Sequence, residues 1–146
     1  QLAAALAMGA SGVELGTAFM ATRECPIQDG IKNAILGADE RSTQLILRSV
    51  KNTGRFYKNH ITKKVAETEA KQPGDFKPIA QFMTGKRVYN SLHKSGDPDD
   101  SCWTCGMAAG MITDIPTCRE FLDRLVSSAE AVIQERLPVL VAPSKL

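Results

Sequence analysis

Residues 12–22 have the sequence Gly-Val-Glu-Leu-Gly-Thr-Ala-Phe-Met-Ala-Thr, and this stretch decides the fold that the sequence predicts. Val13 and Leu15 alternate with Glu14 in the period-2 pattern of a short β-strand. Gly16 permits a tight turn close to a ligand, and Thr17 is a favourable N-cap for a following helix. Such a turn points several backbone N–H groups at one place, where a phosphate group can bind. An ordinary strand-to-helix turn without a ligand is the alternative.

The residues before this stretch extend the same pattern. Residues 2–8 are rich in Ala and Leu, which predicts a helix that ends at Gly9. A helix, a short strand, a Gly-Thr turn and a second helix follow one another as in a parallel α/β barrel or open sheet. In barrels, phosphate is commonly bound after the last two strands.

Residues 3–22 resemble the region around the last barrel strand in the nitronate monooxygenase (2-nitropropane dioxygenase) family. Members of that family are FMN-dependent (β/α)8 barrels. The resemblance therefore implies an α/β fold, in which this chain is the C-terminal part of an FMN-binding TIM barrel. Residues 1–24 would form the last barrel βα unit, and residues 25–146 a mostly helical C-terminal segment with a targeting tail.

The same resemblance implies the residues that bind the cofactor. It places the backbone of Glu14, Leu15, Gly16 and Thr17 against the phosphate of FMN. Because this prediction comes from the family resemblance, a turn whose backbone is open to a ligand would support it.

Length and charge limit the other classes of function. The chain has 146 residues and a net charge of +2, which is too small to favour a nucleic acid or a membrane surface as partner. No apolar run approaches the length that spans a bilayer. The chain begins at Gln1 inside a predicted helix, and a closed barrel needs roughly 200 residues. We therefore expect part of a longer enzyme, which on its own is inactive and holds FMN poorly.

Beyond residue 25 the apolar spacing predicts mainly helices. The predicted elements are a helix at 27–38, a strand at 44–48, a helix at 56–71, a short helix at 76–83, a polar loop at 85–100 and a last helix that Pro138 ends. Thr117 and Glu120 have the spacing of a capping box at the start of that last helix.

Residues 51–55 have the sequence Lys-Asn-Thr-Gly-Arg, which is similar to a run found in the same family. A solvated charged loop near the mouth of the barrel is the favoured interpretation. A phosphate-binding basic patch is the alternative.

Cys102 and Cys105 have CxxC spacing, for which there are three interpretations. A redox dithiol needs a depressed thiol pKa, whereas the acidic loop at 97–100 would raise it. A zinc site would have to add Cys118 and His93, and that set has no recognised spacing. Structural cysteines are therefore favoured, and we predict no metal site.

Residues 103–112 resemble a family segment that lies beside the flavin. Gly106 and Gly110 are four residues apart, which suits close packing of the backbone. Met107 stands where many members have Gln, so we do not expect this side chain to donate a hydrogen bond to the cofactor.

No catalytic residue is expected in this chain. His60 lies in a charged stretch and His93 in a polar one, so both are predicted to lie on the surface. In the family, the catalytic His comes from an earlier barrel strand. The resemblance implies an FMN-dependent nitronate monooxygenase that oxidises alkyl nitronates, such as propionate 3-nitronate, with oxygen. Another FMN barrel, such as an enoyl-thioester reductase, and a truncated, non-catalytic remnant that acts by binding a partner are the alternatives.

The last three residues, Ser144, Lys145 and Leu146, match the C-terminal tripeptide that the peroxisomal import receptor reads. The peroxisomal import receptor is therefore a predicted partner, and the peroxisome the predicted location. If the tripeptide is a coincidence, we expect a cytoplasmic enzyme.

Overall fold

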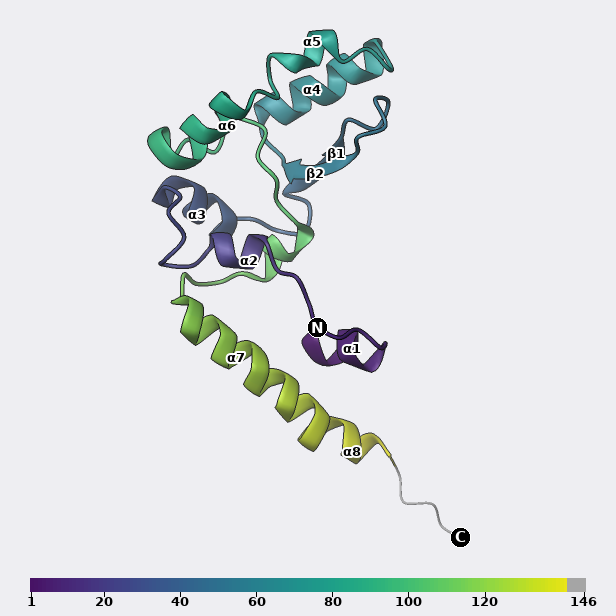
Figure 1. Ribbon diagram of the computed structural model, residues 1–146, viewed down its shortest axis with the longest axis vertical. Coiled ribbons are helices and arrows are strands. Elements are labelled where there is room, and N and C mark those ends of the chain that lie inside the picture. The colour runs from purple at the N-terminus through teal and green to yellow at the C-terminus, as the bar shows by residue number, and fades with distance from the viewer. Residues whose placement is uncertain (142–146) are drawn as a thin grey trace. The chain divides into compact units, whose positions relative to one another are not determined.

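The computed structural model describes residues 1–141, and the predicted targeting tripeptide at 144–146 lies outside the described residues. The chain divides into two compact units (Figure 1). The terminal unit combines Gln1–Leu15 with the chain from Pro116 onward, and the central unit is Gly16–Ile115. The predicted segments 1–24 and 25–146 were defined by their place in a barrel, and they remain predictions.

The terminal unit consists of α1 (Leu2–Ala7) and a long helical stretch near the C-terminus. After α1, Gly9 has a φ of +94°, and the N–H of Ala10 donates to the carbonyl of Ala5. This is a Schellman ending, so the predicted helix end at Gly9 is confirmed. Residues 12–15 form no strand, although a strand was predicted there, because they have no ladder partner among residues 1–141.

The long helical stretch comprises α7 (Cys118–Ala131), a π-helical turn (Val132–Arg136) and α8 (Leu137–Leu140). The predicted capping box is confirmed, since Thr117 Oγ1 accepts from the N–H of Glu120 and Glu120 accepts from the N–H of Thr117. The prediction that Pro138 ends the helix is wrong. Pro138 lies in the first turn of α8, where its missing N–H leaves no helical hydrogen bond unmade.

The central unit contains an antiparallel hairpin of β1 (Thr43–Ile46) and β2 (Gly54–Tyr57), in which Leu45 pairs with Arg55. Helix α4 (His60–Lys71) packs against β1, and α5 (Lys77–Ala80) packs against α4 (Figure 1). These elements enclose a first core of Ile46, Leu47, Phe56, Ile61, Val65, Ile79, Phe82 and Cys102. The predicted helix at 56–71 begins four residues late, because residues 54–57 extend the hairpin and Asn59 caps α4.

A second core lies around α2 (Thr17–Met20), α3 (Asp29–Leu36) and a 3-10 helix (Met107–Met111). Its buried members are Ala21, Ile27, Ile31, Ile35, Trp103, Cys105 and Ala109. A Cβ on Gly110 would lie 2.8 Å from the backbone nitrogen of Glu40, so this position requires glycine. Close backbone packing at Gly110 is thereby confirmed.

The prediction of a loop over residues 85–100 is wrong for most of its length. Helix α6 (Gly85–Asn90) continues into a π-helical turn (Ser91–Ser95). Val88 and Leu92 are one helical turn apart and pack against the second core. Their spacing indicates a helix, although most residues of this stretch are polar. Gly96 ends this stretch with a φ of +68°. No helix among residues 1–141 combines the length and the apolar character needed to cross a bilayer.

Residues 103–105 lie alongside β2 as a strand-like segment, which we call the Trp103 segment. The N–H of Tyr57 donates to the carbonyl of Trp103 at 3.0 Å, and the N–H of Cys105 donates to the carbonyl of Arg55 at 3.3 Å. Phe56 and Thr104 form the antiparallel bridge between these two bonds. The segment therefore connects the hairpin, which belongs to the first core, with the second core.

Glu69 on α4 fixes the chain where it leaves β1. Its buried carboxylate accepts from the N–H of Leu47, at 2.8 Å, and from the N–H of Ser49. Leu47 has a φ of +64°, an unusual value for a branched residue. The two hydrogen bonds hold this conformation and with it the path of the hairpin.

Glu69→Ala is expected to lower the free energy of unfolding by about 2 to 3 kcal/mol, because the buried N–H of Leu47 and the partly buried N–H of Ser49 lose their acceptor. Urea unfolding of the 146-residue chain measures this. Glu67→Ala, an exposed position on the same helix, serves as the control and is expected to change little. Equal losses in the two variants would contradict the role given to Glu69.

Candidate functional site

A cavity of about 320 Å³ lies within the central unit, at the start of α2. Its lining residues are Gly16, Thr17, Met20, Arg55, Thr104, Cys105 and Gly106. We call it the Thr17 cavity. Its volume is at the lower end of the range of small-molecule sites, roughly 300 to 1,000 Å³. Two of the four predicted phosphate contacts, Gly16 and Thr17, therefore line one cavity.

The other two, Glu14 and Leu15, belong to the terminal unit and are not lining residues of this cavity. Their contact with a phosphate remains a prediction from the family resemblance.

Thr17 has a different role from the one predicted by its place in the sequence. Gly16 is the N-cap of α2, and Thr17 is the first helical residue. Thr17 Oγ1 accepts a hydrogen bond from the N–H of Gly106 at 2.9 Å. Gly106 directly follows the Trp103 segment, so the hydroxyl joins the end of that segment to α2, and its proton remains a donor that a ligand can use.

The backbone at Gly16 is open toward the cavity. A Cβ built on Gly16 would meet no atom within 4 Å, so the residue's small size is not needed for packing within the chain. Its φ is −96°, which any residue can adopt. Within the described residues, neither packing nor backbone strain requires glycine here, which leaves the backbone of Gly16 open to a ligand.

Arg55 lines the same cavity, although residues 51–55 were assigned to a solvated loop in the favoured sequence interpretation. It comes from β2, and its Nη1 donates to Thr43 Oγ1 at 3.0 Å. The sequence alone does not show that Arg55 and Thr17 line one cavity, because the residues between them, Thr104 to Gly106, come from a distant part of the chain. The alternative interpretation, a phosphate-binding basic patch, agrees with this position.

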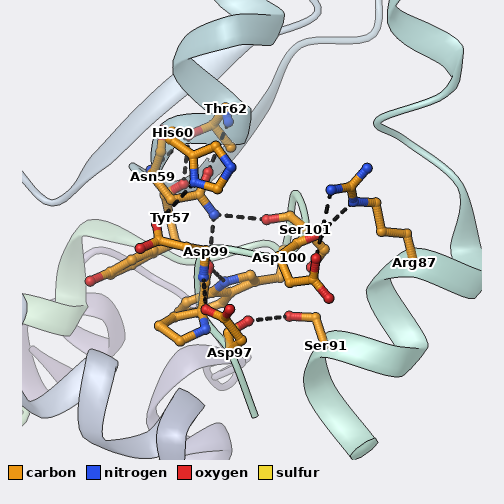
Figure 2. Close-up of polar contacts among 12 residues, drawn as sticks. Tyr57, Asn59, His60, Thr62, Arg87, Ser91, Asp97, Asp99, Asp100 and Ser101 are labelled. Carbon is orange, nitrogen blue, oxygen red and sulfur yellow. Dashed lines mark hydrogen bonds and ion pairs between the residues drawn. The ribbon is translucent and has the colours of Figure 1, made fainter. Parts of the chain in front are cut away.

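The loop at 97–101 fixes where the Trp103 segment begins (Figure 2). Asn59 caps α4 with its side-chain oxygen, and its Nδ2 donates to the carbonyls of Pro98, at 2.7 Å, and Ser101, at 2.8 Å. Trp103 Nε1 donates to the carbonyl of Pro98 as well, at 2.9 Å. The Trp103 ring stacks on Tyr57 with ring centroids 4.5 Å apart. These contacts determine the position of the Trp103 segment on β2.

Cys102 and Cys105 are both buried and free, and they contribute to different cores. Burial raises the pKa of each thiol to about 11, so both are protonated at neutral pH. A protonated thiol is a poor nucleophile, which favours structural cysteines over a redox dithiol. Residues 1–141 hold no group of three or more His, Cys, Asp or Glu side chains that is placed to bind a metal.

The two histidines lie away from the cavity lining. His60 is largely exposed, with its Nδ1 3.8 Å from the carboxylate of Asp99 (Figure 2). His93 Nδ1 lies 3.3 Å from the carbonyl of Pro26, and its ring packs against Tyr89. Neither is placed to act on a ligand in the Thr17 cavity.

Known proteins resemble this chain over nearly its whole length. It is 29% identical over 139 residues to a nitronate monooxygenase from Paraburkholderia phytofirmans, covering 95% of this chain and 36% of that protein. It is 22% identical to an indene-carboxyl-CoA dehydrogenase from Mycobacterium tuberculosis, covering 91% of this chain and 47% of that protein. The chain thus spans less than half the length of these curated relatives.

Solved structures show the fold. FabK from Thermotoga maritima superposes with a TM-score of 0.86 at 23% identity, over 95% of this chain and 43% of that chain. A point mutant of the same protein gives a TM-score of 0.78 at 21% identity, over 96% of this chain and 41% of that chain. FabK is a TIM-barrel protein, so the predicted fold class, part of an α/β barrel with mainly helical structure in this chain, is confirmed.

The family is shown by a model that spans most of the chain. The model described as nitronate monooxygenase matches residues 1–128, which include every lining residue of the Thr17 cavity. The family resemblance predicted from residues 3–22 is therefore confirmed, and the chain belongs to the nitronate monooxygenase family of oxidoreductases.

Proposed function

We propose that the whole protein carrying this chain is an FMN-dependent nitronate monooxygenase, which oxidises alkyl nitronates such as propionate 3-nitronate with oxygen. Family membership supports the class of reaction. The observation that carries the proposal is the open backbone at Gly16, which lies in the Thr17 cavity where the family resemblance implies the flavin phosphate.

The residues of the cavity fit a phosphate group. The first N–H groups of α2 have no acceptor inside the helix, and the Thr17 hydroxyl retains its proton for donation. Arg55 adds a positive charge, and none of the lining residues in the described part of the chain is acidic. A dianionic phosphomonoester would meet donors and a cation without a repelling carboxylate.

When bound, FMN would supply the electron-transfer chemistry of the reaction. The role of this chain is to hold one end of the cofactor. Gly16 leaves space for the phosphate, Thr17 donates a hydrogen bond, and the Trp103 segment closes one side of the cavity through Gly106. The catalytic base is expected outside this chain, because the family resemblance implies that the catalytic His comes from an earlier barrel strand.

In the full-length protein, Gly16→Val is expected to remove most of the bound FMN while leaving the protein folded. The branched side chain would occupy the space of the phosphate without striking any neighbour in this chain. Flavin absorbance of the purified protein and oxygen uptake with propionate 3-nitronate measure the two effects. Gly85→Val, at another open glycine outside the cavity, is the matched control and should keep its FMN.

Three results would contradict the proposal. Full FMN content in Gly16→Val would exclude the cavity as the phosphate site. A flavin-containing wild-type protein that reduces an enoyl thioester, and takes up no oxygen with nitronates, would favour the alternative barrel enzyme. A full-length protein without flavin or oxidase activity would favour the non-catalytic remnant.

We also propose a peroxisomal location, on the basis of Ser144, Lys145 and Leu146. Flavin oxidations that use oxygen can release peroxide, and this compartment degrades it. The import receptor would bind the free C-terminal tripeptide.

An N-terminal fluorescent fusion of the full-length protein is expected in punctate peroxisomes. Deleting only the last three residues should move the signal to the cytosol, because the receptor reads the tripeptide itself. Diffuse cytosolic signal from the intact protein would show that the tripeptide is a coincidence.

A further inference from the structure

Arg55 is a cation without a counter-charge in the described part of the chain. The ion pairs among residues 1–141 join Arg41 to Glu40, His60 to Asp99 and Arg87 to Asp100. None includes Arg55. Its side chain donates to the Thr43 hydroxyl, which is neutral. A guanidinium held in a cavity by a neutral group can still accept an anion.

The β2 backbone determines where this side chain lies. Successive side chains of a strand point to opposite faces, and Phe56 is buried in the first core. Arg55 and Tyr57 therefore share the other face, where Tyr57 stacks on Trp103 and Arg55 lines the cavity. The Thr43 hydroxyl fixes one end of the guanidinium, which reduces the rotamer freedom that binding would cost.

The cavity has a single sign of charge. Among the described residues that line the cavity, Arg55 alone is charged at neutral pH, because the Cys105 thiol is protonated. The remaining polar groups are the hydroxyls of Thr17 and Thr104 and the backbone of two glycines. Hydrogen-bond donors from the start of α2, from β2 and from residues 104–106 therefore surround the cavity, and one of them, the Arg55 guanidinium, is positively charged.

From this arrangement we infer that Arg55 binds the phosphate of the flavin. The β1–β2 hairpin would thereby supply one phosphate contact in addition to those of the turn at residues 14–17. The inference rests on the proposed function, and it names a contact that the turn at residues 14–17 does not include. The planar guanidinium has donors left after its bond to Thr43, and these can contact two phosphate oxygens at once. Arg55 would thus favour FMN over riboflavin, which has no phosphate.

The first test uses the full-length protein freed of flavin, with inorganic phosphate as the ligand, and follows binding by ¹⁵N–¹H NMR. Phosphate in the millimolar range should shift the Arg55 Nε–H signal together with the amides of Gly16, Thr17 and Gly106. Arg55→Ala should weaken this binding about tenfold or more, because a charge-assisted hydrogen bond is lost. Arg48→Ala removes the same charge from an exposed position near the hairpin and should bind phosphate as the wild type does.

The second test compares FMN with riboflavin in the full-length protein. Arg55→Ala should weaken FMN about tenfold or more and leave riboflavin unchanged, whereas a fold defect would weaken both. Arg55→Lys keeps the charge but loses the paired donors, so it should lie between the wild type and Arg55→Ala.

The outcomes separate this inference from the proposed function. Unchanged preference for FMN in Arg55→Ala would overturn the role of Arg55 and leave a flavin enzyme in place. Equal shifts of the Arg55 signal by acetate and by phosphate would overturn the phosphate assignment in favour of a general anion site. Failure of the full-length protein to bind either flavin would overturn the proposed function, while the phosphate titration would still decide whether Arg55 binds the anion.

Discussion

The pairing of the Trp103 segment with β2 is the constraint on which the candidate site depends. Two backbone hydrogen bonds, from Tyr57 to Trp103 and from Cys105 to Arg55, place residues from distant parts of the central unit on one side of a cavity. Without this pairing, Gly106 would have no fixed position from which to donate to Thr17. Arg55 would then belong to a hairpin unconnected with α2. The site is therefore a product of tertiary pairing and not of one local motif.

Hydrogen bonds of buried polar side chains stabilise that pairing. Asn59 uses its oxygen to cap α4 and its nitrogen to hold the loop at 97–101, so one side chain links the helix to the start of the segment. Unsatisfied buried groups are costly, which makes such a network specific for one arrangement. Glu69 acts similarly at the other end of the hairpin, where it holds Leu47 in an unusual conformation.

The sequence predicted those features that depend on local chemistry. The helix end at Gly9 and the capping box at Thr117 were identified because each needs only a few adjacent residues. The start of a helix directly after Gly16 was predicted in the same way, whereas the phosphate contact of this turn remains a prediction. Arg55 was assigned to a solvated loop, because charge alone does not show which strand lies beside it. Thr17 was predicted to cap its own helix, whereas a distant backbone N–H uses its hydroxyl.

The other errors have related causes. Polar composition concealed α6, whose formation depends on two apolar residues that reach the second core. No strand forms at residues 12–15, since a strand requires a hydrogen-bonded neighbour and none is present among residues 1–141. These cases show that composition predicts exposure on average, whereas individual contacts decide which segments become ordered.

A crystal structure of the full-length protein with FMN would test the central claim most directly. The account predicts the phosphate within hydrogen-bond distance, about 3 Å, of the Thr17 hydroxyl and the Arg55 guanidinium, beside the open backbone of Gly16. A phosphate bound elsewhere, with Thr17 and Gly106 still joined and the cavity without any part of the flavin, would contradict it.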